Sequence, residues 1–313
     1  MNRWRYVLTG VIMLLSICLV IPDKSAMAED KIRIVTTTSV LADVVKQIAG
    51  DRASIFYVAS PKRDMHRVAP TPKDVLMARK ADVFIHHGLQ AEPWLLPLLN
   101  AAGKQAFFSD PLSGIDASMG IEPLEVPIEV SRLEGDIHPM GNPHYWLDPE
   151  TMKQVAATIE SVLGQKYPEL ATVFKNGRQA YEKKLDERLA DWSRRLKPFE
   201  GQSLVTYHRS WSYFAERFGF QVVGEIEPKP GIPVTSRHMS QLIETMKQKK
   251  AKIVIKEPFH ENKTPRKIAE ATGAVVIELA QAVGAIKETD DYLSLMEYNI
   301  RELEQAFQEI SHA

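Results

Sequence analysis

One uninterrupted helical pattern occupies the middle of the chain, from Glu169 to Lys197. Apolar side chains recur there at spacings of three and four residues, which places them on one face of a helix. They are Tyr181, Leu185, Leu189, Trp192 and Leu196. The other face is heavily charged, and no glycine or proline follows Gly177 in this stretch. At 1.5 Å per residue, the helix would be roughly 40 Å long, the length of a whole folded lobe.

Strand and helix patterns alternate in the sequence before this helix. Short apolar runs predict strands at Lys31–Thr38, Ala53–Ala59, Asp82–His87 and Gln105–Ser109. Helices are predicted after Ser39, after Thr71, at Glu92–Asn100 and from Asp148 to Leu163. The run Thr71-Pro72-Lys73-Asp74 carries a capping residue, a proline at the first helical position and an early carboxylate. The segment from Pro111 to Pro143 has little periodicity and is predicted to be a long loop.

A second alternating set follows the long helix. The predicted strands are Ser203–Tyr207, Gln221–Ile226, Lys252–Lys256 and Ala274–Leu279. The predicted helices are Trp211–Phe218, Thr235–Gln248, Thr264–Thr272 and Asp290–Ile310. Alternation of this kind is typical of α/β folds with a mostly parallel sheet. We therefore expect two α/β lobes, each with a four-stranded, mostly parallel sheet flanked by helices, joined by one long α-helix.

The N-terminus has the pattern of a secretory signal. Two arginines in MNRWRY precede an apolar run of about 15 residues, and Ala26-Met27-Ala28 provides a small-x-small cleavage site. The run is shorter than the roughly 20 residues of a membrane span, although an uncleaved anchor is the alternative. The expected division is a signal peptide at 1–28, an N-terminal α/β lobe at 29–168, the linking helix at 169–197 and a C-terminal α/β lobe at 198–313. The mature protein is expected to be periplasmic or otherwise extracytoplasmic.

Composition restricts the chemistry of the mature chain. The only cysteine, Cys18, lies inside the predicted signal, so a transition metal would have to be held by His, Asp or Glu. The formal net charge of −1 offers no basis for nucleic-acid binding.

Three of the nine histidines lie in loops next to predicted strands or helices. His66 follows the second strand, His144 precedes a helix, and His208 ends the first strand of the second lobe. Ligands of open α/β sheets bind at the carboxyl ends of the strands. The three side chains could therefore meet in the cleft between the lobes.

Three longer motifs surround these histidines: DMHRVAPTPKDVLMARKADVFIHHGLQAEPWL, GNPHYWLDPE and VTYHRSWSYFAERFGF. Their order and spacing over nearly the whole mature chain resemble the solute-binding proteins of ABC transporters for zinc and manganese. His87 stands where that family usually has asparagine, which is a minor departure.

The resemblance implies that His66, His144 and His208 are metal ligands. It also implies a protein, expected to be a monomer, that captures a divalent transition metal between its lobes and delivers it to an ABC permease. Three imidazoles suit Zn²⁺, and in the family a histidine at the third position accompanies zinc more often than manganese. A manganese- or iron-binding protein of the same transporter class is the alternative.

The fourth ligand is where the sequence departs from the family. Ala280 occupies the place of the aspartate that many members carry. Glu257, at the end of a neighbouring strand, is the preferred candidate, and Glu278 or water are the alternatives. His138 is a candidate for metal capture, and His260 for an accessory ligand.

Two other classes of function have less support in the sequence. Three histidines and a water could form a zinc hydrolase, but the chain has no H-E-x-x-H motif and no visible general base. It also has no G-x-S-x-G, G-x-G-x-x-G or P-loop motif. A surface adhesin is a third possibility, without a repeat or stalk to support it. A binding protein is therefore expected, not an enzyme.

Overall fold

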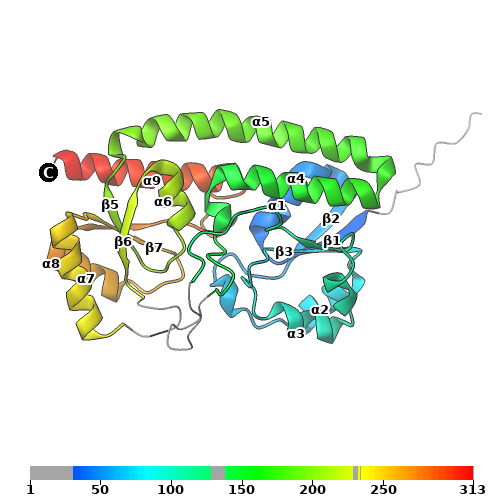
Figure 1. Cartoon of the computed structure of the whole chain (residues 1–313), viewed down its shortest axis with the longest axis horizontal. Helices are drawn as coiled ribbons and strands as arrows, with labels where there is room; N and C mark the ends of the chain where they lie inside the picture. The colour runs from blue at the N-terminus through cyan, green and yellow to red at the C-terminus, as the bar shows by residue number, and fades with distance from the viewer. Residues whose placement is uncertain (1–30, 128–137, 228–231, 233, 313) are drawn as a thin grey trace, which may run out of the picture. The chain divides into compact units, whose positions relative to one another are not determined.

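Two separate parallel sheets form the framework of the protein in a computed structural model of the whole chain, shown in Figure 1. The structure describes residues 31–312 apart from 128–137, 228–231 and 233. The first sheet has the strand order β2-β1-β3-β4 and the second the order β6-β5-β7-β8. All paired neighbours run parallel. The predicted fold class is confirmed, and the sheets are parallel throughout the described residues.

The first sheet alternates with helices as the sequence predicted. Its elements are β1 (Ile32–Thr36), α1 (Ser39–Ala49), β2 (Ala53–Tyr57), α2 (Pro72–Lys80), β3 (Val83–His86), α3 (Leu95–Ala102) and β4 (Gly114–Asp116), and α4 (Pro149–Lys166) follows. Thr71 and Asp74 form the expected reciprocal capping box at the start of α2. At α1 the capping side chain is that of Thr38, and Ser39 is already the first helical residue.

The predicted fourth strand at Gln105–Ser109 is wrong. Gln105–Phe108 forms a 3-10 helix, in which only Phe107 is buried. Its backbone N–H groups find partners within the same turn, because Phe107 donates to Lys104 and Ser109 to Ala106. The fourth strand is Gly114–Asp116, inside the predicted loop, where it pairs with the end of β3.

The second sheet follows the predicted order without exception. Its elements are β5 (Ser203–Thr206), α6 (Ser212–Phe218), β6 (Gln221–Glu225), α7 (Ser236–Lys249), β7 (Ile253–Lys256), α8 (Lys263–Thr272), β8 (Val275–Glu278) and α9 (Tyr292–His312). Central strand β7 is fully buried, as its continuous apolar run requires.

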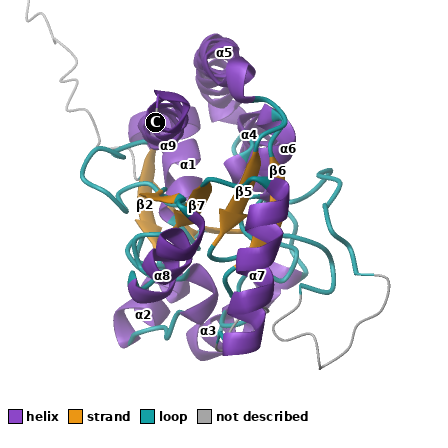
Figure 2. Ribbon diagram, turned by 90° about the vertical axis from the view of Figure 1, so that its left-hand side faces the viewer, coloured by secondary structure: helices purple, strands orange, loops and turns teal. Residues whose placement is uncertain are grey.

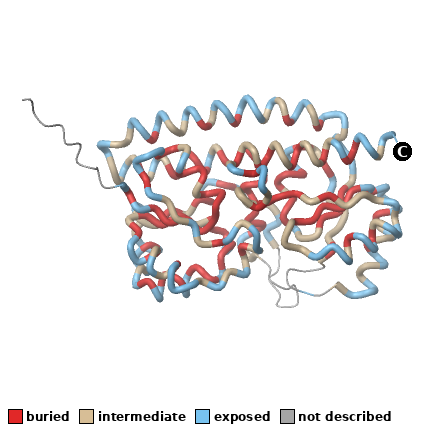
Figure 3. Tube along the Cα trace, turned by 180° about the vertical axis from the view of Figure 1, so that it is seen from behind, coloured by how far each residue is buried: buried red, intermediate tan, exposed pale blue. Residues whose placement is uncertain are grey.

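The long helix α5 spans Ala171–Leu196, with a 3-10 turn at either end. Its buried residues are Phe174, Tyr181, Leu185, Trp192 and Leu196, four of them on the predicted face. This face packs against α4 and α1 of the first half and against α9 of the second (Figures 1 and 2). Figure 3 shows that the rest of α5 is largely exposed. One helix therefore contacts both halves of the protein.

Residues 31–313 form one compact unit, so the proposed boundaries at 168 and 198 separate two sheets within a single body. Those boundaries stay a prediction. The predicted signal peptide at 1–28 lies outside the described residues. Within the described part of the chain, no helix has the length and apolar character needed to cross a membrane.

Candidate metal centre

His66 lies in a single 3-10 turn, Met65–Arg67, that follows β2. The carboxylate of Asp64 starts this turn by accepting the backbone N–H of His66 at 2.9 Å. The ring nitrogen Nδ1 lies 2.7 Å from the carbonyl oxygen of Ala91. A carbonyl can only accept a hydrogen bond, so Nδ1 carries the proton and Nε2 carries the lone pair.

His144 is held by the residues that precede it. Gly141 adopts φ 101°, and a Cβ there would lie 2.8 Å from the carbonyl oxygen of Leu124, so the chain turns where only glycine fits. Asn142 then accepts both the backbone N–H and the Nδ1–H of His144, at 3.0 and 2.8 Å. His144 is buried, and its Nε2, like that of His66, carries the lone pair.

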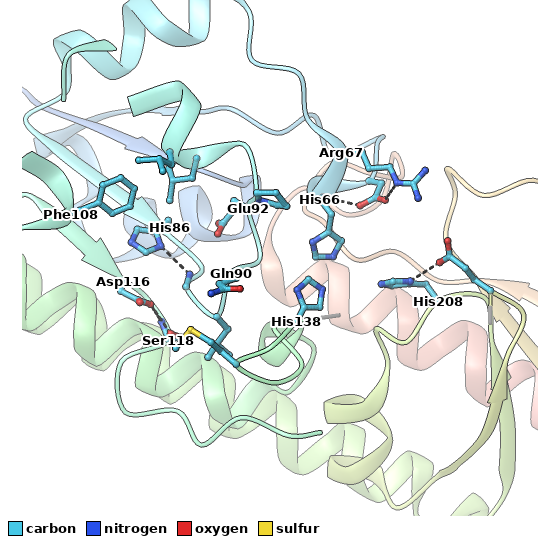
Figure 4. A pocket seen from close by; sticks show the side chains of 18 residues that line it. His66, Arg67, His86, Gln90, Glu92, Phe108, Asp116, Ser118, His138 and His208 are labelled. Carbon is cyan, nitrogen blue, oxygen red and sulfur yellow. Dashed lines mark hydrogen bonds and ion pairs between the residues drawn. The ribbon is translucent and has the colours of Figure 1, made fainter. Parts of the chain in front are cut away.

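His208 comes two residues after β5, at the carboxyl end of the second sheet. Its Nδ1 donates to the carboxylate of Glu227 at 2.8 Å, drawn as a dashed line in Figure 4. A carboxylate that orients a metal-binding imidazole in this way also raises its basicity. The lone pair of Nε2 is thus available to bind a metal ion.

The three histidines meet at one point. One ligand atom from each of His66, His144 and His208 lies within 4.8 Å of the others. The Nε2 atoms of His66 and His144 are 3.0 Å apart, although both Nδ1 protons are engaged elsewhere. In a tetrahedral zinc site with Zn–N bonds of 2.0–2.1 Å, such nitrogens lie about 3.3 Å apart. A cation between them would satisfy all three lone pairs, so the residues present fit a metal ion.

The electrostatics of the cluster differ from ring to ring. Burial, with His66 and His208 nearby, holds the pKa of His144 well below its usual range. Burial is the largest effect on His208 and acts to lower its pKa, but the hydrogen bond to Glu227 and the negative charges of Glu257, Glu227 and Asp64 together raise the pKa. His144 is therefore neutral and able to bind metal across the physiological pH range.

Glu257, the predicted fourth ligand, is not part of the cluster formed by the described residues. Its side chain is fully buried, and Oε1 accepts hydrogen bonds from Ser210 Oγ, Trp211 Nε1 and Gln281 Nε2. Its Oε2 has no hydrogen-bond partner and lies 3.3 Å from His260 Nε2. The carboxylate thus anchors the chain just after His208, and its role as a ligand stays a prediction.

The alternative residues lie at different places. Glu278 accepts from Lys256 Nζ at 2.7 Å and is outside the cluster. The ring of His138 lies 4.9 Å from that of His66, centroid to centroid, and Figure 4 shows it facing His66. Burial and the neighbouring His66 and His208 lower the pKa of His138 to about 3. His138 therefore sits beside the metal centre without joining the group of three.

Two supporting residues were missed in the sequence. Glu227 follows β6, and a carboxylate at the end of a strand is the signal that could have identified it. Asn142 is the second, because its amide also donates to Glu125 and to the carbonyl of Arg209, at 2.9 Å each. Arg209 directly follows His208, so the side chain of Asn142 links the loops that carry His144 and His208, one from each half of the protein.

Comparisons with known proteins identify the family and the fold. The sequence model of the family described as zinc-uptake complex component A, periplasmic, matches residues 34–306. The chain is 28% identical over 286 residues to the iron-binding protein YfeA of Yersinia pestis, covering 88% of this chain and 86% of that protein. It is 25% identical over 277 residues to the manganese-binding lipoprotein MntA of Halalkalibacterium halodurans, covering 86% of each. A crystal structure of ZnuA has the same fold, with a TM-score of 0.75 at 24% identity over 88% of this chain and 99% of that one.

Proposed function

The chain belongs to the zinc-uptake component A family, and on this premise we propose that it captures Zn²⁺ outside the cytoplasmic membrane and delivers it to an ABC permease. Membership makes it a metal-binding solute-binding protein of an ABC transporter and not an enzyme. Beyond family membership, we propose three things: the identity of the metal, the residues that bind it and the extracytoplasmic location.

The convergence of three Nε2 lone pairs carries this proposal. His66 and His144 come from loops of the first half and His208 from the second, and each Nδ1 proton is already donated to an oxygen acceptor. Such an arrangement presents three oriented nitrogen ligands before any ion arrives. Preorganisation lowers the entropic cost of binding. We propose that these three side chains are the ligands.

Zinc is supported by the donor set. Imidazole nitrogen suits Zn²⁺, whereas Mn²⁺ prefers carboxylate and water oxygens. Because two relatives are named for binding iron and manganese, the alternative is that this chain binds manganese or iron. A direct comparison of metals therefore belongs in the first experiment.

That experiment is a competition titration of the metal-stripped protein with Zn²⁺ and Mn²⁺ against a chromophoric chelator. We expect one tight zinc site and much weaker manganese binding. His66→Ala, His144→Ala and His208→Ala should each weaken zinc binding by more than the roughly 10–100-fold cost of losing a supporting partner. His312→Ala, at the exposed end of α9, is the matched control and should change nothing.

The outcome that refutes this proposal is zinc binding that survives all three ligand substitutions. The same titration tests Glu257. If Glu257 is a metal ligand, Glu257→Gln should weaken zinc binding as strongly as the loss of a histidine does. If Glu257 only anchors Ser210 and Trp211, the Glu257→Gln variant should keep most of its zinc affinity, because the amide oxygen of glutamine can still accept their hydrogen bonds.

Lobe movement on binding is expected to be small. The helix α5 packs against α1 and α4 as well as α9, so wide opening would have to break those contacts. Capture would then depend on ordering of the loops that carry the ligands. We expect a monomer, because the three proposed ligands come from one chain.

A further inference from the structure

A cavity of about 510 Å³ opens directly from the metal centre. His66, His138 and His208 line one end, and His86, Phe108 and Ser118 line the other (Figure 4). The three-histidine cluster occupies only the first end. The far end lies between β3, β4 and the 3-10 helix Gln105–Phe108 and has no role in the function proposed so far.

The volume is much larger than a bare ion needs. A water molecule occupies about 30 Å³, so an ion with one or two waters would fill a small part of the space. Sites for small organic molecules typically measure about 300–1,000 Å³ and are mostly apolar with a few polar groups. The cavity falls within that range.

The far wall is apolar and accessible. Phe108 is 50% exposed and Leu96 is 53% exposed, and both line the cavity. The ring of Phe108 stands edge-on to His86, with centroids 6.4 Å apart. An aromatic body could pack against the exposed faces of these side chains, which suits the preference of rings for offset or edge contacts.

Two polar groups at this end still have bonding capacity. The N–H of Gly88 donates to Nδ1 of His86 at 3.1 Å, so the neutral ring carries its proton on Nε2, for which the described residues supply no acceptor. Burial lowers the pKa of His86, which keeps the ring neutral. Asp116 accepts the N–H and O–H of Ser118 on one oxygen, at 2.9 and 2.7 Å, and its other oxygen has no hydrogen bond from the described residues. The far end thus offers one donor and one acceptor to a ligand.

We propose that this cavity holds the organic part of a metal chelate, and that the protein can take up zinc together with a small amino-acid chelator bearing an aromatic side chain. The inference rests on the proposed function. Three histidine ligands leave one or two coordination positions for the amine and carboxylate of the chelator. Its ring would pack against Phe108 and exchange hydrogen bonds with His86 and Asp116. L-histidine has this chemistry, because its imidazole offers both a donor and an acceptor.

Equilibrium dialysis of the metal-stripped protein with radiolabelled L-histidine tests this inference. With Zn²⁺ present, one histidine per chain should be retained, and none without zinc. Glycine has the same chelating head without the ring and should be retained at least tenfold more weakly at equal free zinc. Binding of Co²⁺ in place of zinc should give a visible absorption band that changes when histidine is added, because the histidine enters the coordination sphere.

Variants locate the bound molecule. Phe108→Ala and Leu96→Ala remove half-exposed side chains, so the fold should survive. Each should lower histidine retention at least tenfold while zinc titration without chelator stays unchanged. Leu112→Ala, which removes an exposed leucine outside the lining, is the matched control.

Two outcomes overturn the inference while leaving the proposed function intact. The first is normal zinc binding with no histidine retained, which would mean that the protein takes the ion alone. The second is equal retention of glycine and histidine, or retention that the cavity variants do not change. A protein that binds no zinc in the absence of chelator would instead contradict the proposed function itself.

Discussion

The long helix α5 contains one glycine, Gly177, at the point where it crosses the last turn of α1. A Cβ on Gly177 would lie 2.3 Å from the carbonyl oxygen of Ile48 and 2.8 Å from that of Gln47. Both atoms belong to the backbone of α1, so they cannot turn aside as a flexible side chain could. We predict that Gly177→Ala destabilises the protein although alanine is the better helix former.

The magnitude follows from two opposing effects. Replacing glycine by alanine in a helix interior gains about 1 kcal/mol from helix propensity. Forcing a methyl group into a packed interface costs about 1–3 kcal/mol, and a clash with backbone belongs at the upper end. We therefore expect a net loss of about 1–2 kcal/mol in the free energy of unfolding.

Gly164 in α4 is the matched control. A Cβ there would meet its nearest neighbour, Ala171 Cβ, at an ordinary 3.6 Å. Gly164→Ala should therefore gain up to about 1 kcal/mol from propensity alone. Urea unfolding of the metal-free protein, followed by both tryptophan fluorescence and far-UV circular dichroism, measures both changes. If Gly177→Ala is as stable as Gly164→Ala, the close crossing of α5 over α1 is not as described.

Three further predictions concern the surroundings of the metal centre. Burial raises the pKa of Glu92 from 4.5 to about 7. The protonated side chain therefore contributes fully to the free energy of unfolding below pH 4.5. This contribution, up to about 3 kcal/mol, is lost as the pH rises through 7. Glu92→Gln, neutral at every pH, should flatten that part of the pH–stability profile in thermal melts, and an unchanged profile would contradict the buried neutral carboxyl. Asn142→Ala removes the acceptor of His144 Nδ1–H and should weaken zinc binding about 10–100-fold by competition titration; unchanged affinity would mean that His144 is oriented by other contacts. Glu227→Ala should cost a similar factor through His208, while Glu227→Gln should recover most of it because its amide oxygen still accepts from Nδ1; equal losses in the two variants would show that charge, and not orientation, is what Glu227 provides.

Local signals in the sequence determined most of the fold. The capping box at Thr71 and the apolar face of the long helix each depend on residues within a few positions of one another. These patterns predicted the helices and seven of the eight strands correctly in kind. The exception was β4, three residues long with a glycine at its start, which is too short to carry a periodic pattern. It becomes a strand only because the edge of β3 is available to pair with it.

The sequence also predicted that the three histidines could meet, because ligands of α/β sheets gather at strand ends, and the structure brings them together. It could not identify what holds them. Ala91 binds the ring of His66 across 25 residues, and Glu227 binds that of His208 across 19. Such partners are chosen by how strands and loops lie side by side, which no local pattern contains.

Glu257 shows the same limit, because the sequence predicted it as a ligand without its tertiary partners being visible. Its position at the end of β7 made it a reasonable ligand, but a strand end specifies only where a side chain starts. Tertiary structure brings Ser210, Trp211 and Gln281 around its Oε1 and leaves it outside the three-histidine cluster. The sequence by itself therefore determined which side chains could bind metal. Only the packing of the two sheets and their loops decided which of them meet, because convergence depends on contacts between residues far apart in the chain.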